Sequence, residues 1–274
     1  MKKARTSLKT VLRIVRLAVC KEVNEMIRIL FLFFVSTTLS CSSQTYERNI
    51  VLINVGTLDR AGIANEIAVI NSLNPNVIAI DLQFSNRTKY QNDLRLISEL
   101  VKCKNLIMVS SVKDYNGNDV EYRKFTYGSL PEFSIMAKTG FSNTILEEDE
   151  FQTLKRFSTH EKVNGSIEYH FAVRTTMEFD SMKTMEFVKN NPRVIDIDYQ
   201  GGKRKFKVFS DSEVLNKKVS RKDIEGKIVM IGFLGPGDED KFFTPLNKKA
   251  KPLKPDMYGV ECWANVVAQV LESN

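Results

Sequence analysis

Short, nearly continuous apolar runs alternate with helical patterns in the first half of the chain. The runs are "NIVLINVG" at 49–56, "VIAIDLQF" at 77–84 and "LIMVSSV" at 106–112. Uniformly apolar runs of this length are typical of strands whose two faces are both buried, as in a parallel sheet. A later run, "KIVMIGFLG" at 227–235, has the same character and predicts one more buried strand.

Two helices are predicted between these strands. Asp59 can cap the first helix, and "NPN" at 74–76 ends it. Its apolar face is formed by Ile63, Ile67, Ile70 and Leu73. The second helix lies in "QNDLRLISELVKCKN", and we expect its inward face to consist of Leu94, Ile97 and Val101.

The rest of the chain is more mixed. "DYNGNDVEYRKFTYGSLP" predicts a long loop or hairpin, and "GSIEYHFAVRTTMEF" predicts a helix that includes His170. "VIDIDYQ" and "KRKFKVF" alternate in polarity around Gly201 and Gly202, which predicts a hairpin. "MYGVECWANVVAQVL" predicts a last helix. The pattern as a whole predicts an α/β fold with a mainly parallel sheet covered by helices on both faces and an inserted β-hairpin region.

A separate apolar run, "MIRILFLFFVSTTLSCSSQ" at 26–44, stands near the N-terminus. Its hydrophobic part spans roughly 11 residues, whereas a membrane-spanning helix needs ~20. Basic residues before the run and small residues after it are typical of an export signal. Three interpretations stay open, namely lipidation of Cys41 as in bacterial lipoproteins, an uncleaved N-terminal anchor, and a core helix. Translation from Met26 instead of Met1 is a further alternative.

The charge is concentrated in the same region. The formal charge of the chain is +7, and residues 1–41 hold eight Lys or Arg against two Glu, so the remainder is nearly neutral. A nearly neutral body argues against a nucleic-acid partner, which requires a basic face. Because the basic residues precede the apolar run, we expect residues 42–274 to lie outside the cytoplasm, on the extracytoplasmic face of a bacterial envelope. Residues 1–41 then form the leader or membrane anchor.

Few residues of the usual metal-binding or nucleophilic types are clustered. The chain has four cysteines without a CxxC pair and only two histidines, so we expect neither a zinc site nor a cofactor. "GFLGPGDEDKFFTP" at 232–245 lacks the GxGxxG order of phosphate loops. A structural loop, a metal loop and an organic-ligand site stay open for this stretch.

Position along the predicted sheet is more informative than these motifs. Ligands of parallel sheets bind beyond the carboxyl ends of the strands. Asp59 follows the first strand, Asp81 lies near the end of the second, and Asp238 and Asp240 follow the last. We expect these acids to converge on one edge of the sheet. No nucleophile with a base partner accompanies them, so a non-enzymatic protein is expected. An exported carboxylate-based or metal-dependent hydrolase is the alternative.

Three stretches together resemble a known family. They are "IVLINVGTLDRAGIANEIAVINSLNPNVIAIDLQF", "TGFSN" with the acidic stretch after it, and "KIVMIGFLGPGDEDKFFTPLN" followed by "PDMYGVECWANVVAQVL". This set is similar to the CHASE type 2 domain, the cyclase and histidine kinase associated sensory extracellular domain. The resemblance covers roughly residues 49–271.

The resemblance implies a sensory module outside the cytoplasm that responds to an unidentified small molecule. It transfers no catalytic residues. The candidate ligand-binding residues are Asp59, Asp81, Asn143, Asp240 and Thr244. Family members are followed by membrane helices and an output domain, whereas three residues follow Leu271 here. We therefore expect the domain to be tethered to the membrane by its N-terminal segment and to relay its state through a partner such as a signalling kinase or cyclase.

Overall fold

The structure is a computed structural model and describes residues 46–117, 121–201, 205–247 and 254–273. These residues belong to one contact unit, Thr45–Asn274. The predicted leader and its Cys41 lie outside the described residues, so the three interpretations of the apolar run stay predictions. None of the helices in the described part of the chain is both long and apolar enough to cross a membrane.

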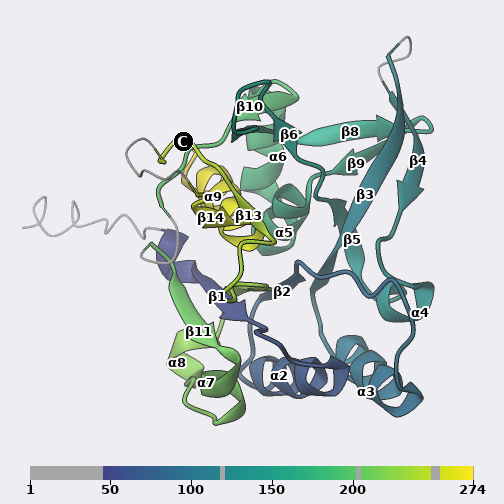
Figure 1. The fold of residues 1–274 in the computed structure, drawn as a ribbon, viewed down its shortest axis with the longest axis vertical. Coiled ribbons are helices and arrows are strands. Elements are labelled where there is room, and N and C mark those ends of the chain that lie inside the picture. Colours follow the sequence, from purple (N-terminus) through teal and green to yellow (C-terminus); the bar gives the residue numbers. More distant parts are fainter. Residues whose placement is uncertain (1–45, 118–120, 202–204, 248–253, 274) are drawn as a thin grey trace, which may run out of the picture. The chain divides into compact units, whose positions relative to one another are not determined.

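A mainly parallel sheet forms the centre of the described region (Figure 1). Its parallel strands, in spatial order, are β11 (Lys207–Ser210), β1 (Ile50–Asn54), β12 (Ile228–Gly232), β2 (Val77–Ile80), β3 (Leu106–Asn116) and β5 (Lys138–Phe141). The three apolar runs of the first half therefore become β1, β2 and β3. β1 and β2 flank β12, so the helix that joins β1 to β2 crosses over a strand from the far end of the sequence.

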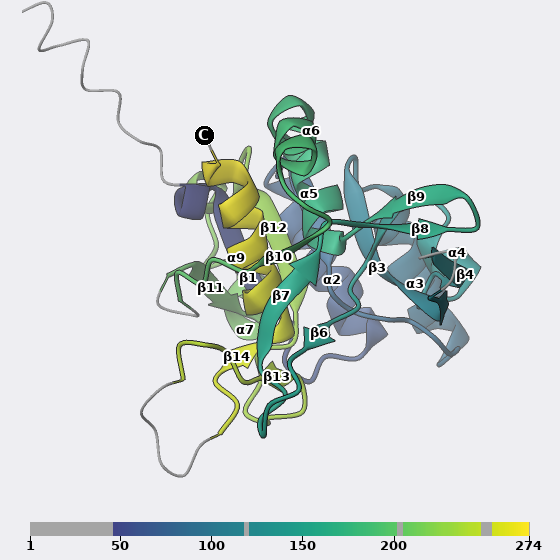
Figure 2. The ribbon, with the colours of Figure 1, turned by 90° about the horizontal axis from the view of Figure 1, so that it is seen from above.

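Helices cover both faces of this sheet, as the sequence predicts. On one face, α2 (Arg60–Ser72) and α3 (Tyr90–Val101) close a core of Ile and Leu side chains. On the other face, α5 (Phe171–Phe179) and α9 (Gly259–Glu272) close a second core around Trp263. Figures 1 and 2 show the two helix layers on opposite sides of the strands. The predicted α/β class is confirmed.

The predicted boundaries of α2 are also confirmed. The Asp59 carboxylate accepts a hydrogen bond from the Gly62 amide at 2.9 Å, which caps the helix. Ile63, Ile67 and Ile70 are buried. The helix ends before Asn74, whose φ of 61° stops helical propagation.

The predicted inward face of α3 is wrong. Leu96 and Leu100 are the apolar side chains of α3 that are fully inside, whereas Leu94 and Val101 are exposed and Ile97 is half-buried. The helix carries apolar residues on two adjacent stripes, and periodicity alone does not say which of them meets the sheet. The buried position of Asp93, which pairs with Arg60 of α2, fixes the rotation of the helix.

Antiparallel strands are inserted at the β3 end of the sheet. β3 continues beyond the parallel region and pairs with β4 (Glu121–Thr126). β8 (His160–Val163) and β9 (Ser166–Tyr169) form a second hairpin. A separate small sheet contains β6 (Ile145–Leu146), β7 (Leu154–Ser158) and β10 (Val194–Asp196). The predicted β-hairpin insertion is therefore present, with the β3–β4 hairpin where the long loop or hairpin is expected.

The predicted hairpin around Gly201 and Gly202 is wrong. The first of its strands, β10, pairs antiparallel with β7, and the second, β11, pairs parallel with β1. Phe206 and Phe209 are buried in the cores on opposite faces of the sheet. This burial on both sides is characteristic of a strand in a covered parallel sheet, and it outweighs the local turn signal.

The helix predicted over "GSIEYHFAVRTTMEF" begins later than expected. Ser166–Tyr169 is strand β9, and His170 is the N-cap of α5. The His170 Nδ1 atom accepts a hydrogen bond from the Ala172 amide at 3.2 Å. Burial among Phe141, Phe157 and Trp263 lowers the pKa of His170 to about 3, so the imidazole is neutral.

The remaining elements are short. They are η1 (Tyr46–Asn49), α4 (Pro131–Ser134), α6 (Ser181–Asn190), α7 (Asp211–Leu215), α8 (Arg221–Ile224), β13 (Lys241–Phe242) and β14 (Met257–Tyr258). Cys103 and Cys262 are buried and free, and burial raises the pKa of the Cys103 thiol to about 12. Both thiols are therefore inert core residues.

Candidate ligand-binding site

A cavity of about 560 Å³ opens beyond the carboxyl ends of β1 and β2. We call it the rim cavity. The turns that follow β1 and β2 and the first turns of α2 and α3 line it. Its volume lies within the range of roughly 300–1,000 Å³ found for small-molecule sites. This is the edge of a parallel sheet at which ligands bind as a rule.

The floor of the rim cavity is apolar. The side chains that form it are Val55, Leu58, Ile63, Leu82, Phe84 and Phe233. Asn54 fixes two of the loops that carry them, because its Oδ1 atom accepts hydrogen bonds from Gly56 at 3.0 Å and from Leu234 at 2.8 Å. Gly56 has a φ of 53°, and a Cβ there would lie 2.7 Å from the Asp211 carboxylate, so this turn requires glycine.

Arg60 builds one wall through a buried ion pair. Its guanidinium lies 2.6 Å from the Asp93 carboxylate and also bonds to Asn86. The same group packs over the Phe133 ring at 4.7 Å. Although burial opposes ionisation, hydrogen bonds from Arg60 and Thr88 hold the pKa of Asp93 at about 2. The wall is therefore charged, paired and rigid.

The mouth of the cavity is polar. Asp59 and Asn92 meet there, with the Asn92 amide donating to the Asp59 carboxylate at 3.0 Å. Lys89 also lines the cavity as the N-cap of α3, and its side chain makes no capping hydrogen bond. An apolar floor with a carboxylate and an ammonium at the mouth suits a small molecule that has both an apolar part and a polar end.

Asp81 and Asp240 come together at the same edge of the sheet. Asp81 directly precedes Leu82 of the cavity floor, and Asp240 lies against Gly259 at the first turn of α9. Burial and then the Asp240 charge raise the pKa of Asp81 to about 7. Burial raises the pKa of Asp240 to about 6, although a hydrogen bond from the Gly259 backbone opposes the shift. Both carboxyl groups therefore have raised pKa values, chiefly because they are buried.

Asn143 and Thr244 are occupied by contacts within the fold. The Asn143 amide bonds to both the N–H and the C=O of Val112 at 2.9 Å, so it replaces a strand partner there. Thr244 donates its hydroxyl proton to Asp256 at 2.7 Å. Neither residue lines the rim cavity. Asp238 forms an exposed ion pair with Lys241 at 2.6 Å. The structure thus places Asp59 at the cavity, Asp81 and Asp240 beside each other, and the other candidates elsewhere.

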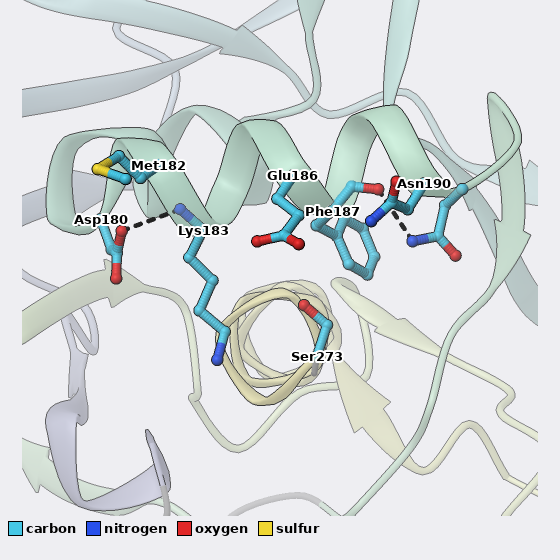
Figure 3. A pocket seen from close by; sticks show the side chains of 8 residues that line it. Asp180, Met182, Lys183, Glu186, Phe187, Asn190 and Ser273 are labelled. Carbon is cyan, nitrogen blue, oxygen red and sulfur yellow. Dashed lines mark hydrogen bonds between the residues drawn. The ribbon is translucent and has the colours of Figure 1, made fainter.

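A second hollow, the α6–α9 cleft, lies between α6 and the end of α9 (Figure 3). Its volume is about 450 Å³. Lys183 and Glu186 project from α6 towards the end of α9, where Ser273 is the C-cap, and Asn190 lies further along α6 beyond Phe187. Phe187 is the one buried apolar side chain in its lining. The cleft is lined mainly by charged and amide groups.

The described part of the chain contains no group of three or more His, Cys, Asp or Glu side chains placed to hold a metal ion.

Several residues of the rim cavity are not identified by the sequence pattern. Arg60, Asn86, Thr88 and Lys89 belong to no motif, and Phe233 lies far from them in sequence. One signal was present, since "SNRTK" at 85–89 is a polar stretch directly after a buried strand. Loops that follow buried strands of parallel sheets are the usual carriers of binding residues.

Comparison with known proteins gives one match. The family model of the CHASE2 domain matches residues 44–274, which is most of the chain. No curated protein and no solved structure was found to match.

Proposed function

The chain belongs to the CHASE2 domain family, a family of extracellular sensory domains, and from this premise we propose that it senses a small molecule in the rim cavity. The observation that carries the proposal is the position of the cavity at the carboxyl ends of β1 and β2. An extracytoplasmic location agrees with the family and with the basic residues that precede the apolar run at 26–44.

The ligand that suits this cavity is a small amphiphilic molecule. The apolar floor favours an aliphatic or aromatic group, while Asp59 and Lys89 at the mouth favour a polar or zwitterionic end. The charge of Lys89 attracts a carboxylate, and Asp59 retains acceptor capacity beyond its two hydrogen bonds. Amino acids and short carboxylic acids meet these requirements.

The ligand has a direct route to the rest of the domain. The first turns of α2 and α3 both line the cavity, and Arg60 of α2 bonds to Asp93 of α3. A ligand that binds one arrangement of the two helices more tightly than another shifts the protein towards that arrangement. A partner that contacts the domain can respond to this shift. We propose a signalling kinase or cyclase as that partner. We further propose that residues 1–41 tether the domain to the membrane, with Cys41 as the lipidated residue of a lipoprotein.

A thermal-shift screen tests the sensory function. Amino acids, short-chain carboxylic acids and aromatic acids are added singly to the purified protein. We expect at least one to raise Tm by about 5 °C at roughly 100 times its Kd, and to be recovered unchanged. Mass spectrometry of the mature N-terminus tests the tether separately, since an acylated Cys41 supports it and an intact Met1 or Met26 contradicts the lipoprotein.

The Asp81–Asp240 pair supports a second candidate, an exported carboxylate-dependent hydrolase. Two neighbouring carboxyl groups with pKa values of about 7 and 6 can exchange protons near neutral pH. Under this alternative, the same compounds are converted to products, with or without added Mg²⁺ or Ca²⁺, and Asp240→Asn abolishes the conversion. Stabilisation without conversion, retained in Asp240→Asn, supports the sensor.

A further inference from the structure

Charge is distributed unevenly between the two edges of the central sheet. The segments that lead into β1, β2, β3 and β12 are 46–49, 73–76, 102–105 and 221–227, and we call them the amino edge. They hold six Lys or Arg against three acidic residues. The segments that follow β1, β2 and β12, at 55–59, 81–89 and 233–240, hold five acidic residues against two Lys or Arg. The parallel strands therefore separate a basic edge from an acidic one.

The segments of the amino edge lie side by side because their strands are neighbours. β1, β12, β2 and β3 follow one another in the sheet, and neighbouring strands lie about 4.8 Å apart. Backbone hydrogen bonds join the loops directly. The Gly226 amide donates to the Asn74 carbonyl at 3.0 Å, and the Asn76 amide donates to the Lys227 carbonyl at 2.8 Å. The Asn105 side chain donates to the Asn76 carbonyl at 2.8 Å, so the basic residues share one continuous surface.

Several cations of the amino edge are not neutralised by the acidic residues near them. Asp223 pairs with Lys207, and Glu225 pairs with Arg221 at 3.3 Å. These two carboxylates are therefore already engaged. The cations without an ion-pair partner in the described part of the chain are Arg48, Lys104, Lys222 and Lys227. The first three are exposed and the fourth is half-buried, so the amino edge presents uncompensated positive charge to solvent.

Both ends of the described chain lie at the amino edge. η1 leads directly into β1 and packs against α9. α9 begins at the opposite edge, where a Cβ on Gly232 at the end of β12 would lie 2.8 Å from that of Val260, and it runs back along the sheet. Figure 2 shows η1 beside the C-terminal end of α9. The segment that precedes Tyr46 therefore joins the domain at its basic edge.

The distance from this edge to the proposed lipid anchor is short. Only residues 42–45 separate Cys41 from Tyr46, so an extended chain places the two Cα atoms at most roughly 18 Å apart. This step rests on the tether proposed above. The amino edge is then held within about two Debye lengths of the headgroups at physiological ionic strength, where anionic lipids attract Lys and Arg side chains.

We propose that the amino edge docks on an anionic lipid surface. The unpaired cations lie against the headgroup phosphates, and the acidic edge is repelled by them. The rim cavity opens at the carboxyl ends of the strands, so its mouth points away from the membrane and stays open to small molecules. The charge separation across the sheet thus orients the sensory domain on its membrane.

Amine footprinting of the full chain on vesicles tests the docking. The chain is bound to vesicles of phosphatidylcholine, with or without phosphatidylglycerol, and its lysines are acetylated by a water-soluble reagent. Mass spectrometry gives the acetylation rate at each lysine. Lys104 and Lys222 report on the amino edge, while Lys89 at the cavity mouth and Lys113 on the distal part of β3 are the matched reporters. All four side chains are exposed.

On anionic vesicles we expect acetylation of Lys104 and Lys222 to slow several-fold, while Lys89 and Lys113 keep their rates. Neutral vesicles should give no protection, and 1 M salt, which shortens the Debye length to about 3 Å, should remove it. Equal protection on neutral vesicles, or protection of Lys113 in place of Lys104, would overturn the proposal. So would protection of Lys104 without vesicles, because a second copy of the chain would then cover this edge.

Charge reversal with a matched control locates the effect. Lys104→Glu with Lys222→Glu should abolish the protection of Lys102 on anionic vesicles. Lys113→Glu with Arg123→Glu changes the net charge equally at exposed positions and should retain it. Circular dichroism checks that both double variants are folded, and equal loss of protection in the two would contradict docking through this edge.

Vesicle flotation separates this proposal from the tether. A chain that floats with neutral and anionic vesicles but shows no protected lysine at the amino edge contradicts the docking and leaves the tether intact. A chain that does not float with neutral vesicles contradicts the tether. In that case, protection of Lys104 and Lys222 on anionic vesicles supports the docking, and its absence overturns it.

Discussion

The rim cavity and the α6–α9 cleft are similar in volume, at about 560 and 450 Å³, but they are built differently. The rim cavity has an apolar floor and a wall fixed by the buried Arg60–Asp93 pair. Apart from Phe187, the cleft is lined by exposed or half-exposed side chains, among them Glu186 and Asn190. The two hollows therefore differ in how their walls are held, although they are similar in volume.

The two hollows also share one feature that makes them comparable. Each contains an Asp that caps the adjoining helix, Asp59 for α2 and Asp180 for α6. Substitutions at equivalent positions can therefore separate the stability of the fold from ligand binding.

Replacing Arg60 should disturb the rim cavity most. Arg60→Met leaves the Asp93 carboxylate buried without its partner, and such a loss is strongly destabilising. We expect Tm to fall by about 10 °C for a domain of this size. Lys183→Met in the α6–α9 cleft should change Tm by less than about 2 °C. Similar changes in the two variants, measured by circular dichroism, would contradict the difference in rigidity.

Glu66 on α2 should make stability depend on pH. It is fully buried, and within the described structure neither carboxyl oxygen has a hydrogen-bond partner. Burial, and secondarily the Asp211 charge, raise the pKa of Glu66 to about 8. The unfolded chain ionises at its ordinary pKa of 4.5, so this carboxyl makes stability fall as pH rises from 4.5 through 8.

Glu66→Gln should remove that contribution. We expect the variant to be more stable than the parent at pH 8 by about 4 kcal/mol and nearly unchanged at pH 4.5. Urea denaturation at the two pH values measures the difference. An equal effect at both values would show that Glu66 is already ionised in the folded protein.

Substitutions of the two capping carboxylates should have the same effect on the stability of the domain but different effects on ligand binding. Asp59→Ala and Asp180→Ala should each cost about 1 kcal/mol through the lost N-cap, whereas Asp59→Asn and Asp180→Asn should cost little because Asn also caps. For the compound found in the thermal-shift screen, we expect only the Asp59 substitutions to raise Kd. A raised Kd in the Asp180 variants would place the ligand in the α6–α9 cleft.

The smallest effect is expected at Glu186. Its carboxylate projects into the α6–α9 cleft and is exposed. Glu186→Gln should change the free energy of unfolding by less than about 0.5 kcal/mol, and it should leave Kd unchanged. Titration of the variant against the parent protein measures both quantities, and a weaker Kd would assign the cleft a direct role.

The sequence predicted β1, β2, β12 and the first half of β3 well because these strands are buried on both faces. That burial leaves a continuous apolar run, as in β1 and β12, which no other element resembles closely. The rotation of α3 was not predictable in the same way. Its two apolar stripes are both compatible with a core, and the deciding residue is Arg60, which is far from α3 in sequence.

The candidate site was predicted in part. The edge of the sheet and the proximity of Asp81 to Asp240 follow from the positions of the strand ends. The pairing of β11 with β1, and the contribution of Phe233 to the cavity floor, depend on contacts between distant segments. The structural bonds of Asn143 and Thr244 likewise follow from tertiary packing, since a motif does not distinguish a side chain that binds ligand from one that bonds to backbone.

Filling each hollow with the same side chain shows which of the two holds the ligand. Leu82→Trp narrows the rim cavity, and Asn190→Trp narrows the α6–α9 cleft by a similar addition. The measurement is the increase in Tm caused by the stabilising compound from the screen, recorded for both variants and the parent. We expect Leu82→Trp to abolish the increase in Tm and Asn190→Trp to retain it. Loss of the increase in Asn190→Trp, with retention in Leu82→Trp, would contradict the assignment of the ligand to the rim cavity.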